Sequence, residues 1–185
     1  MKRVCIDAGH GYKKNKPTGA RANGVVEDDL AKVMALKLKW YLTQRGVKVI
    51  LTRSNDNYVT LQSRAALAKR EKCDCFVSIH VNAAGNVNAC GVEAMVAEGD
   101  MRSLPLAEAV MDVLRGSQMR DRGVKWDSQS QHSSLYVLRN TYKRMPAVLV
   151  ELGFCTHVPD AARMSSRVWQ EGVAAGIAKV IADYK

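Results

Sequence analysis

The sequence predicts one α/β domain whose central sheet is largely parallel. Short apolar runs typical of buried strands alternate along the chain with longer segments in which apolar residues recur every three or four positions, as on one face of a helix. Strands that alternate with helices favour crossover connections and therefore a parallel sheet. The chain has 185 residues, enough for a core of its own, and no linker, repeat or low-complexity tract divides residues 1–185.

In the first half of the chain, three predicted strands alternate with two predicted helices. The strands are expected at residues 3–7, 47–52 and 75–80. The first helix spans residues 27–45 and stops at Gly46. The second spans residues 61–72 and follows Thr60, whose hydroxyl can cap it. A polar, glycine-containing loop precedes the first helix.

The second half is predicted to hold three more strands and two more helices. These strands are expected at residues 91–97, 135–138 and 147–151, and the middle one is short. Ser103 can cap a helix that runs to Gly116, and the polar residues 116–134 are expected to form a long loop. The last helix spans residues 165–182 and is expected to pack through Val168 and Ile177, among others.

The charge balance favours anionic partners. The chain carries 28 Lys and Arg against 18 Asp and Glu, so its net charge is +10, which suits nucleic acid, an anionic membrane or a polyanionic cell wall. Aromatic residues make up only 6%, and no basic cluster is interleaved with stacking rings, so a nucleic-acid-binding module is not expected. No apolar run approaches the roughly 20 residues that span a bilayer, so no integral membrane segment is expected.

The cysteines and the N-terminus predict synthesis in the cytoplasm. The five cysteines show no paired spacing and no C-x-x-C, and Cys5, Cys75 and Cys155 sit in apolar runs typical of buried thiols. Such cysteines fit a reducing compartment. The basic start at Lys2 and Arg3 is followed by an apolar run far too short for the core of a signal peptide.

Four polar residues at element ends are the candidates for chemistry. His10, His80 and Glu151 each follow an apolar strand, and Glu27 opens the first helix. Ligands of open α/β sheets bind beyond the carboxyl ends of the strands, so these side chains are expected at one edge. Two histidines and one carboxylate make a familiar catalytic zinc set, and a second carboxylate can move protons.

Each of these residues also has a structural interpretation. A histidine at a strand end is often only hydrogen-bonded, and Glu27 in a first helical turn can simply offset the helix dipole. Glu151 is harder to dismiss, because a carboxylate that ends an almost wholly apolar strand is costly to bury without a partner. P-loop, H-E-x-x-H and G-x-S-x-G motifs are absent.

Five sequence blocks, in order and over nearly the whole chain, resemble the zinc-dependent N-acetylmuramoyl-L-alanine amidases of type 3. The blocks are Asp7-Ala8-Gly9-His10-Gly11; Gly19 through Gly24 to Glu27; Leu51-Thr52-Arg53 with Asp56, Leu61 and Arg64; Ser78-Ile79-His80-Val81-Asn82; and Pro146 through Glu151 to Phe154. Each block alone is weak, and the five together are specific. Tyr12 and His157 depart from the family pattern, away from the residues that the resemblance assigns to the metal.

The resemblance implies a site, a fold and an activity. By position, His10, Glu27 and His80 would hold Zn²⁺ and Glu151 would be the catalytic carboxylate. The fold would be a mixed sheet of about six strands flanked by helices. The substrate would be peptidoglycan, and the bond cleaved the amide between N-acetylmuramic acid and L-alanine, with Glu151 taking the proton of the attacking water and returning it to the leaving amine.

The biological setting is predicted as that of a phage or prophage endolysin, which is made in the cytoplasm and reaches the cell wall after a holin opens the membrane. A host amidase that lacks its export segment is the main rival. Two other functions stay open: a zinc amidohydrolase or peptidase that acts on a soluble substrate, and a non-catalytic module that binds the wall. Nothing in the sequence predicts the oligomeric state.

Overall fold

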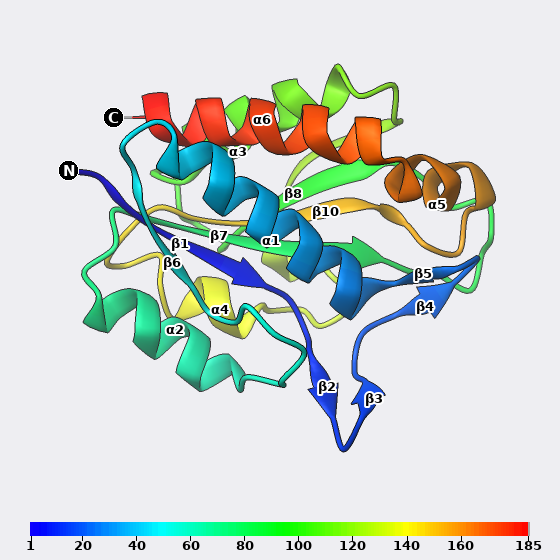
Figure 1. The fold of residues 1–185 in the computed structure, drawn as a ribbon, viewed down its shortest axis with the longest axis horizontal. Coiled ribbons are helices and arrows are strands. Elements are labelled where there is room, and N and C mark those ends of the chain that lie inside the picture. The colour runs from blue at the N-terminus through cyan, green and yellow to red at the C-terminus, as the bar shows by residue number, and fades with distance from the viewer. Residues whose placement is uncertain (185) are drawn as a thin grey trace.

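A mixed six-stranded sheet forms the centre of the computed structural model, which describes residues 1–184 (Figure 1). In sheet order its strands are β6 (Lys48–Leu51), β1 (Arg3–Ala8), β7 (Cys75–Asn82), β10 (Ala147–Phe154), β8 (Val92–Val96) and β9 (Asp121–Trp126). All neighbours are parallel except β10 and β8, which pair antiparallel. The predicted α/β class and the mixed, mostly parallel sheet of about six strands are confirmed.

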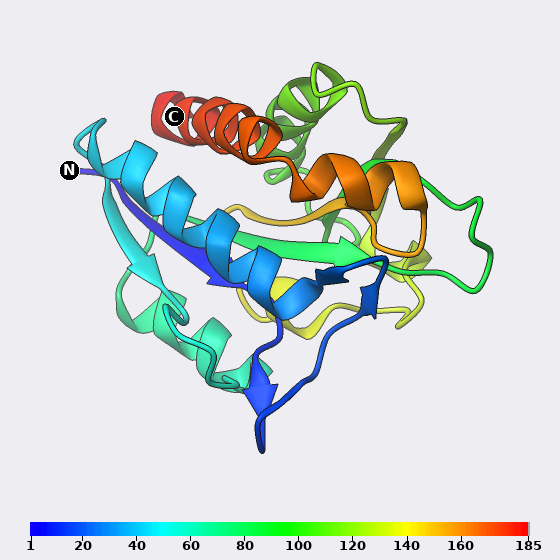
Figure 2. The same cartoon turned by 45° about the vertical axis from the view of Figure 1, so that its right-hand side comes forward.

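Helices cover both faces of the sheet unequally (Figures 1 and 2). One face carries α1 (Glu27–Thr43), α3 (Leu104–Arg115), α5 (Val158–Ser165) and α6 (Arg167–Asp183). The other face carries only α2 (Leu61–Arg70) and the short α4 (Tyr136–Arg139). No helix within residues 1–184 is both long and apolar enough to cross a membrane.

The thinly covered face is the one that receives polar side chains. Successive side chains of a strand point to opposite faces, and in β7 Val77 and Ile79 join the large core under α1, α3 and α6. Phe76 joins the smaller core under α2 and α4, so His80, four residues on, points to that same face. The smaller core covers this face only partly, so polar side chains at the carboxyl ends of the strands can contact a ligand there.

Two predictions in the second half of the chain are wrong. Residues 116–134 are not one long loop, because they contain β9 and a 3₁₀ turn at Asp127–Gln129. A half-exposed edge strand need not be apolar on both faces, so β9 gave no strand signal. The strand expected at residues 135–138 is the helix α4, in which the consecutive Val137 and Leu138 are both buried. A short apolar run does not distinguish a strand from a helix.

The two predicted helix caps have different outcomes. Thr60 caps α2 as expected, since its hydroxyl accepts a hydrogen bond from the Ser63 amide at 3.1 Å. Ser103 does not cap α3. Its buried hydroxyl instead donates to Asp100 and accepts from the amide of Ala147 at 2.7 Å, which joins the start of α3 to the start of β10.

The prediction that α6 packs through both Val168 and Ile177 is right for Ile177 and wrong for Val168. Ile177 is fully buried against the large core, whereas Val168, in the first turn, is 83% exposed. Residues 168 and 177 are nine positions apart, which at about 100° per residue places them on opposite sides of the helix. Trp169, in the same first turn as Val168, does pack against the large core.

We therefore expect Ile177→Ala to lower the free energy of unfolding by about 2–5 kcal/mol, because it empties a packed site. Val168→Ala, on the same helix, should change it by less than about 0.5 kcal/mol. Urea denaturation of both variants measures the two values, and equal losses would show that the Val168 side chain is also packed.

Candidate metal centre

Three of the four predicted site residues meet at one point beyond the carboxyl end of β1. Glu27 Oε1 lies 3.2 Å from His10 Nε2 and 3.0 Å from His80 Nδ1. One ligand atom from each of the three side chains lies within 4.8 Å of the other two. The expectation that they converge on one sheet edge is confirmed.

Each of the three residues comes from a different element. His80 is near the end of β7, and His10 lies in the loop after β1 with a left-handed backbone of φ 56°. Glu27 is the first residue of α1, which starts directly after the small hairpin of β4 (Arg21–Ala22) and β5 (Val25–Val26). The fold, rather than any local sequence motif, therefore brings the three metal-ligand candidates together.

The Glu27 carboxylate is held from several sides. Its Oε2 accepts a hydrogen bond from the amide of Ala20 at 2.8 Å, and its Oε1 accepts one from the amide of Val81 at 3.0 Å. Burial alone would raise the pKa of Glu27, but hydrogen bonds from His10 and His80 and their charges outweigh burial and lower it strongly. Burial lowers the pKa of His10, but the hydrogen bond and the charge of Glu27 outweigh burial and raise it.

Two glycines leave the space that the site needs. A Cβ on Gly9 would lie 2.5–2.7 Å from three atoms of the His80 ring. A Cβ on Gly19 would lie 2.8 Å from Glu27 Oε2 and 3.0 Å from Cγ of His10. Such contacts are well inside van der Waals distance, so any other residue at either position would push a site residue aside.

A buried ion pair fixes the strand that leads into His10. Asp7, on β1, accepts hydrogen bonds of 2.6 Å from the Arg64 guanidinium and from the hydroxyls of Thr52 and Ser78. Burial opposes ionisation of Asp7, but the Arg64 charge and the two hydroxyls outweigh it and lower the pKa of that carboxyl. Arg64 also donates to the carbonyl of His10 itself, which joins this ion pair to the site.

A second arginine ties the same loop to α1. Arg53 donates to the carbonyl of Gly9 and to the carbonyl of Asp28, both at 2.6 Å. The carboxylate of Asp28 in turn accepts from the amides of Gly11 and Gly19 at 2.7 and 2.9 Å. The loop that carries His10 is therefore bonded on both sides to the helix that begins with Glu27.

Glu151 lies one strand away from the metal-ligand candidates. In the sheet register Glu151 pairs with His80 on β7 and with Glu93 on β8, so the three side chains stand in one row on the same face. Its Oε2 is buried and has no hydrogen-bond partner among residues 1–184. Burial, together with the negative charges of Glu27 and Glu93, raises the pKa of Glu151 well above its usual range.

Glu93 is a residue that sequence reasoning missed. It is buried and accepts from Arg122 at 2.7 Å, from Lys125 at 2.5 Å and from the side-chain amide of Asn82 at 2.9 Å. The signal was present in the sequence, because Glu93 interrupts an apolar strand as Glu151 does. The roles of Arg53 and Arg64 were missed as well, although both lie in one of the resemblance blocks. His132 is exposed and lies outside this set of site residues.

The residues present fit zinc. Bonds of about 2.0–2.1 Å in tetrahedral geometry place the ligand atoms of zinc about 3.3 Å apart. The two distances at Glu27, 3.2 and 3.0 Å, are close to that value, and two imidazoles with one carboxylate make a set that leaves a coordination position open. The unpartnered Oε2 of Glu151 gives the same edge a group ready to hold a proton.

Comparison with known proteins gives one consistent match. The profile of a family described as N-acetylmuramoyl-L-alanine amidase matches residues 4–183. The uncharacterised protein YqiI of Bacillus subtilis (strain 168) is 38% identical over 187 residues, which cover 99% of this chain and 84% of that protein. An endolysin of Bacillus phage SPP1 is 36% identical and is matched over 98% of this chain and 65% of its own length.

The fold has a solved counterpart. The catalytic domain of CwlV, an N-acetylmuramoyl-L-alanine amidase from Bacillus (Paenibacillus) polymyxa var. colistinus, superposes with a TM-score of 0.88 at 33% sequence identity. The match covers 100% of this chain and 98% of that one.

We expect Gly9→Ala to weaken zinc binding by at least about tenfold, because the added methyl group displaces the His80 ring. Gly85→Ala is the matched control, since a Cβ there meets nothing within 4 Å and binding should not change. Competition with a fluorescent zinc chelator measures both affinities. Equal affinities in the two variants would show that the His80 ring does not have to occupy this position.

The raised pKa of Glu151 has a consequence for stability. Burial and the neighbouring carboxylates make the folded chain hold this proton to a higher pH than the unfolded chain, in which the pKa is about 4.3. In the metal-free protein, Glu151 therefore lowers the free energy of unfolding as the pH rises above that value. We expect Glu151→Gln to raise the melting temperature by about 2–4 °C more at pH 8 than at pH 4.

The exposed Glu108 supplies the control for this measurement. Glu108→Gln should give small shifts that are similar at both pH values. A gain for Glu151→Gln that is the same at pH 4 and pH 8 would mean that its charge is not suppressed in the folded state.

Proposed function

The chain belongs to the N-acetylmuramoyl-L-alanine amidase family and is a peptidoglycan amidase, and we propose that it works with a zinc ion held by His10, Glu27 and His80. The observation that carries this proposal is the convergence of those three side chains within 4.8 Å beside the unpartnered Glu151 Oε2. The bond hydrolysed is the amide that joins N-acetylmuramic acid to L-alanine.

The chain's own residues supply the proton transfers. A zinc ion in such a set acts as a Lewis acid, which activates water and polarises a carbonyl. Glu151 accepts a proton at its unpartnered Oε2 and later donates it to the leaving amine of L-alanine. The negative charge of Glu93 stands beside Glu151, and ion pairs with Arg122 and Lys125 hold the Glu93 carboxylate in place.

Digestion of purified peptidoglycan tests this proposal. With zinc added, mass spectrometry should find free stem peptides that begin with L-alanine beside unbroken glycan chains, and a chelator should abolish them. Uncut peptidoglycan with zinc bound would favour a soluble substrate. Uncut peptidoglycan with no metal bound would favour a wall-binding module.

Two substitutions should separate metal binding from proton transfer. We expect His80→Ala to lose bound zinc, because it removes one of three ligands. Glu151→Gln should keep zinc and lose at least about a hundredfold in kcat, the usual contribution of a general acid–base group. The measurements are zinc content by atomic absorption and kcat on a muramoyl peptide.

The exposed His132 serves as the control, and His132→Ala should keep both zinc and activity. Full zinc occupancy in His80→Ala would remove His80 from the ligand set. Unchanged turnover in Glu151→Gln would remove Glu151 from the mechanism.

For the biological role we propose cell lysis after synthesis in the cytoplasm and release through a holin-type opening. Support comes from the 36% identity to the phage SPP1 endolysin and from the net charge of +10, which favours an anionic wall. Cells that express the chain should lyse only when a holin is co-expressed. Lysis without a holin would favour an exported amidase instead, and a Glu151→Gln version separates enzymatic lysis from toxicity.

A further inference from the structure

A basic hairpin projects from the domain next to the candidate metal centre. It consists of β2 (Tyr12–Lys13) and β3 (Lys16–Pro17), joined by Lys14 and Asn15, whose φ angles of 51° and 57° suit a tight two-residue hairpin turn. The hairpin stands clear of the sheet and its helices in both ribbon views (Figures 1 and 2). Its exposed Lys13, Lys14 and Lys16 are called here the lysine arm.

The lysine arm is anchored to the site at its base. The hairpin begins two residues after His10, and the Tyr12 hydroxyl donates to Asp29, in the first turn of α1, at 2.9 Å. The Tyr12 amide donates to the carbonyl of Asp56, and its carbonyl accepts from the amide of Tyr58 at 3.1 Å. These bonds fix the direction in which the arm leaves the domain.

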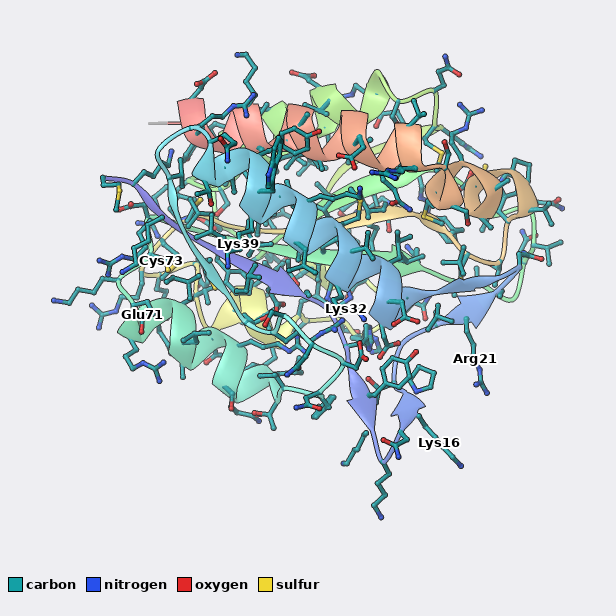
Figure 3. All side chains as sticks on the ribbon, viewed as in Figure 1. Lys16, Arg21, Lys32, Lys39, Glu71 and Cys73 are labelled. Carbon is teal, nitrogen blue, oxygen red and sulfur yellow. The ribbon has the colours of Figure 1, made fainter. Side chains whose placement is uncertain are left out.

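Acidic side chains near the arm are engaged elsewhere. Lys32, on α1, pairs with both Asp29 and Asp56. Within residues 1–184, none of the three lysines of the arm forms an ion pair with an acidic side chain. Figure 3 shows Lys16 extending away from the domain, whereas Lys32 lies at α1. The arm therefore offers cations that no acidic group of the described chain neutralises.

One lysine of the arm lies near a residue that lines a pocket beside the candidate metal centre. Lys13 Nζ is 5.8 Å from the centre of the Tyr58 ring. Tyr58, with Thr18 and Leu61, lines a pocket of about 270 Å³ that also contains His10 and His80. Tyr58 and Leu61 are each about 40% exposed. An anionic chain that enters this pocket next to Tyr58 therefore meets a free ammonium group on the way.

We propose that the lysine arm and Tyr58 bind the stem peptide of the substrate through the carboxylate that follows L-alanine. The inference rests on the proposed function. His10, His80 and Tyr58 line one small pocket, so a group bound beside Tyr58 would lie close to the scissile bond. In the proposed substrate, the stem peptide carries the carboxylates nearest to that bond. Phosphates of other wall polymers share this anionic chemistry, and the test separates the two sources.

The test compares two muramoyl peptides that differ in one group. In one, the residue after L-alanine carries a free carboxylate, and in the other that carboxylate is an amide. The wild-type protein should cleave the carboxylate form with a kcat/KM about fivefold higher, and added salt should shrink the difference because the lysines are exposed. The triple variant Lys13→Gln, Lys14→Gln, Lys16→Gln should lose this preference and still cleave the amide form at the wild-type rate.

A second triple variant controls for net charge. Lys39, Lys69 and Lys143 are also exposed and form no ion pair within the described chain, so replacing them with Gln removes the same charge outside the hairpin and should keep the preference. A lysine-arm variant that retains the preference overturns the proposal. So does one that loses only binding to whole walls, since that result assigns the arm to wall phosphates. Failure of the wild-type protein to cleave either peptide would instead contradict the proposed function.

Discussion

The buried carboxylate of Glu27 is the contact on which the rest of the site depends. It accepts hydrogen bonds from two backbone amides, at Ala20 and Val81, and stands 3.2 and 3.0 Å from the ring nitrogens of His10 and His80. A carboxylate without such partners would cost several kcal/mol to bury. In the metal-free chain the amides and the ring nitrogens of His10 and His80 surround it, and a metal ion would bind between the same rings and the carboxylate, so one arrangement serves both states.

The surrounding fold restricts where those three side chains can go. The Asp7–Arg64 ion pair and the carbonyl contacts of Arg53 hold the loop after β1, and Gly9 leaves the space that the His80 ring occupies. Removing one partner of a buried ion pair typically costs about 3–5 kcal/mol, because the other charge stays buried. The contacts that hold the metal-ligand candidates in place therefore also stabilise this edge of the sheet.

Much of this arrangement could be predicted from the sequence, and the failures have physical causes. The alternation of apolar runs and helical periodicity predicted the α/β sheet, and polar residues at strand ends predicted the edge where His10 and His80 meet. The edge strand β9 was not predicted, because a strand at the edge of a sheet can be polar and then lacks the apolar pattern of a buried strand. The role of Glu93 was not predicted, because its ion pair with Arg122 depends on the pairing of β8 with β9, which no local sequence pattern encodes.

X-ray absorption at the zinc edge of the zinc-loaded protein tests the central claim most directly. The account predicts only nitrogen and oxygen ligands at about 2.0–2.1 Å, with the multiple-scattering signature of two imidazoles. A sulfur ligand at about 2.3 Å would place the ion at one of the five free cysteines, and it would contradict the assignment of His10, Glu27 and His80 as the metal centre.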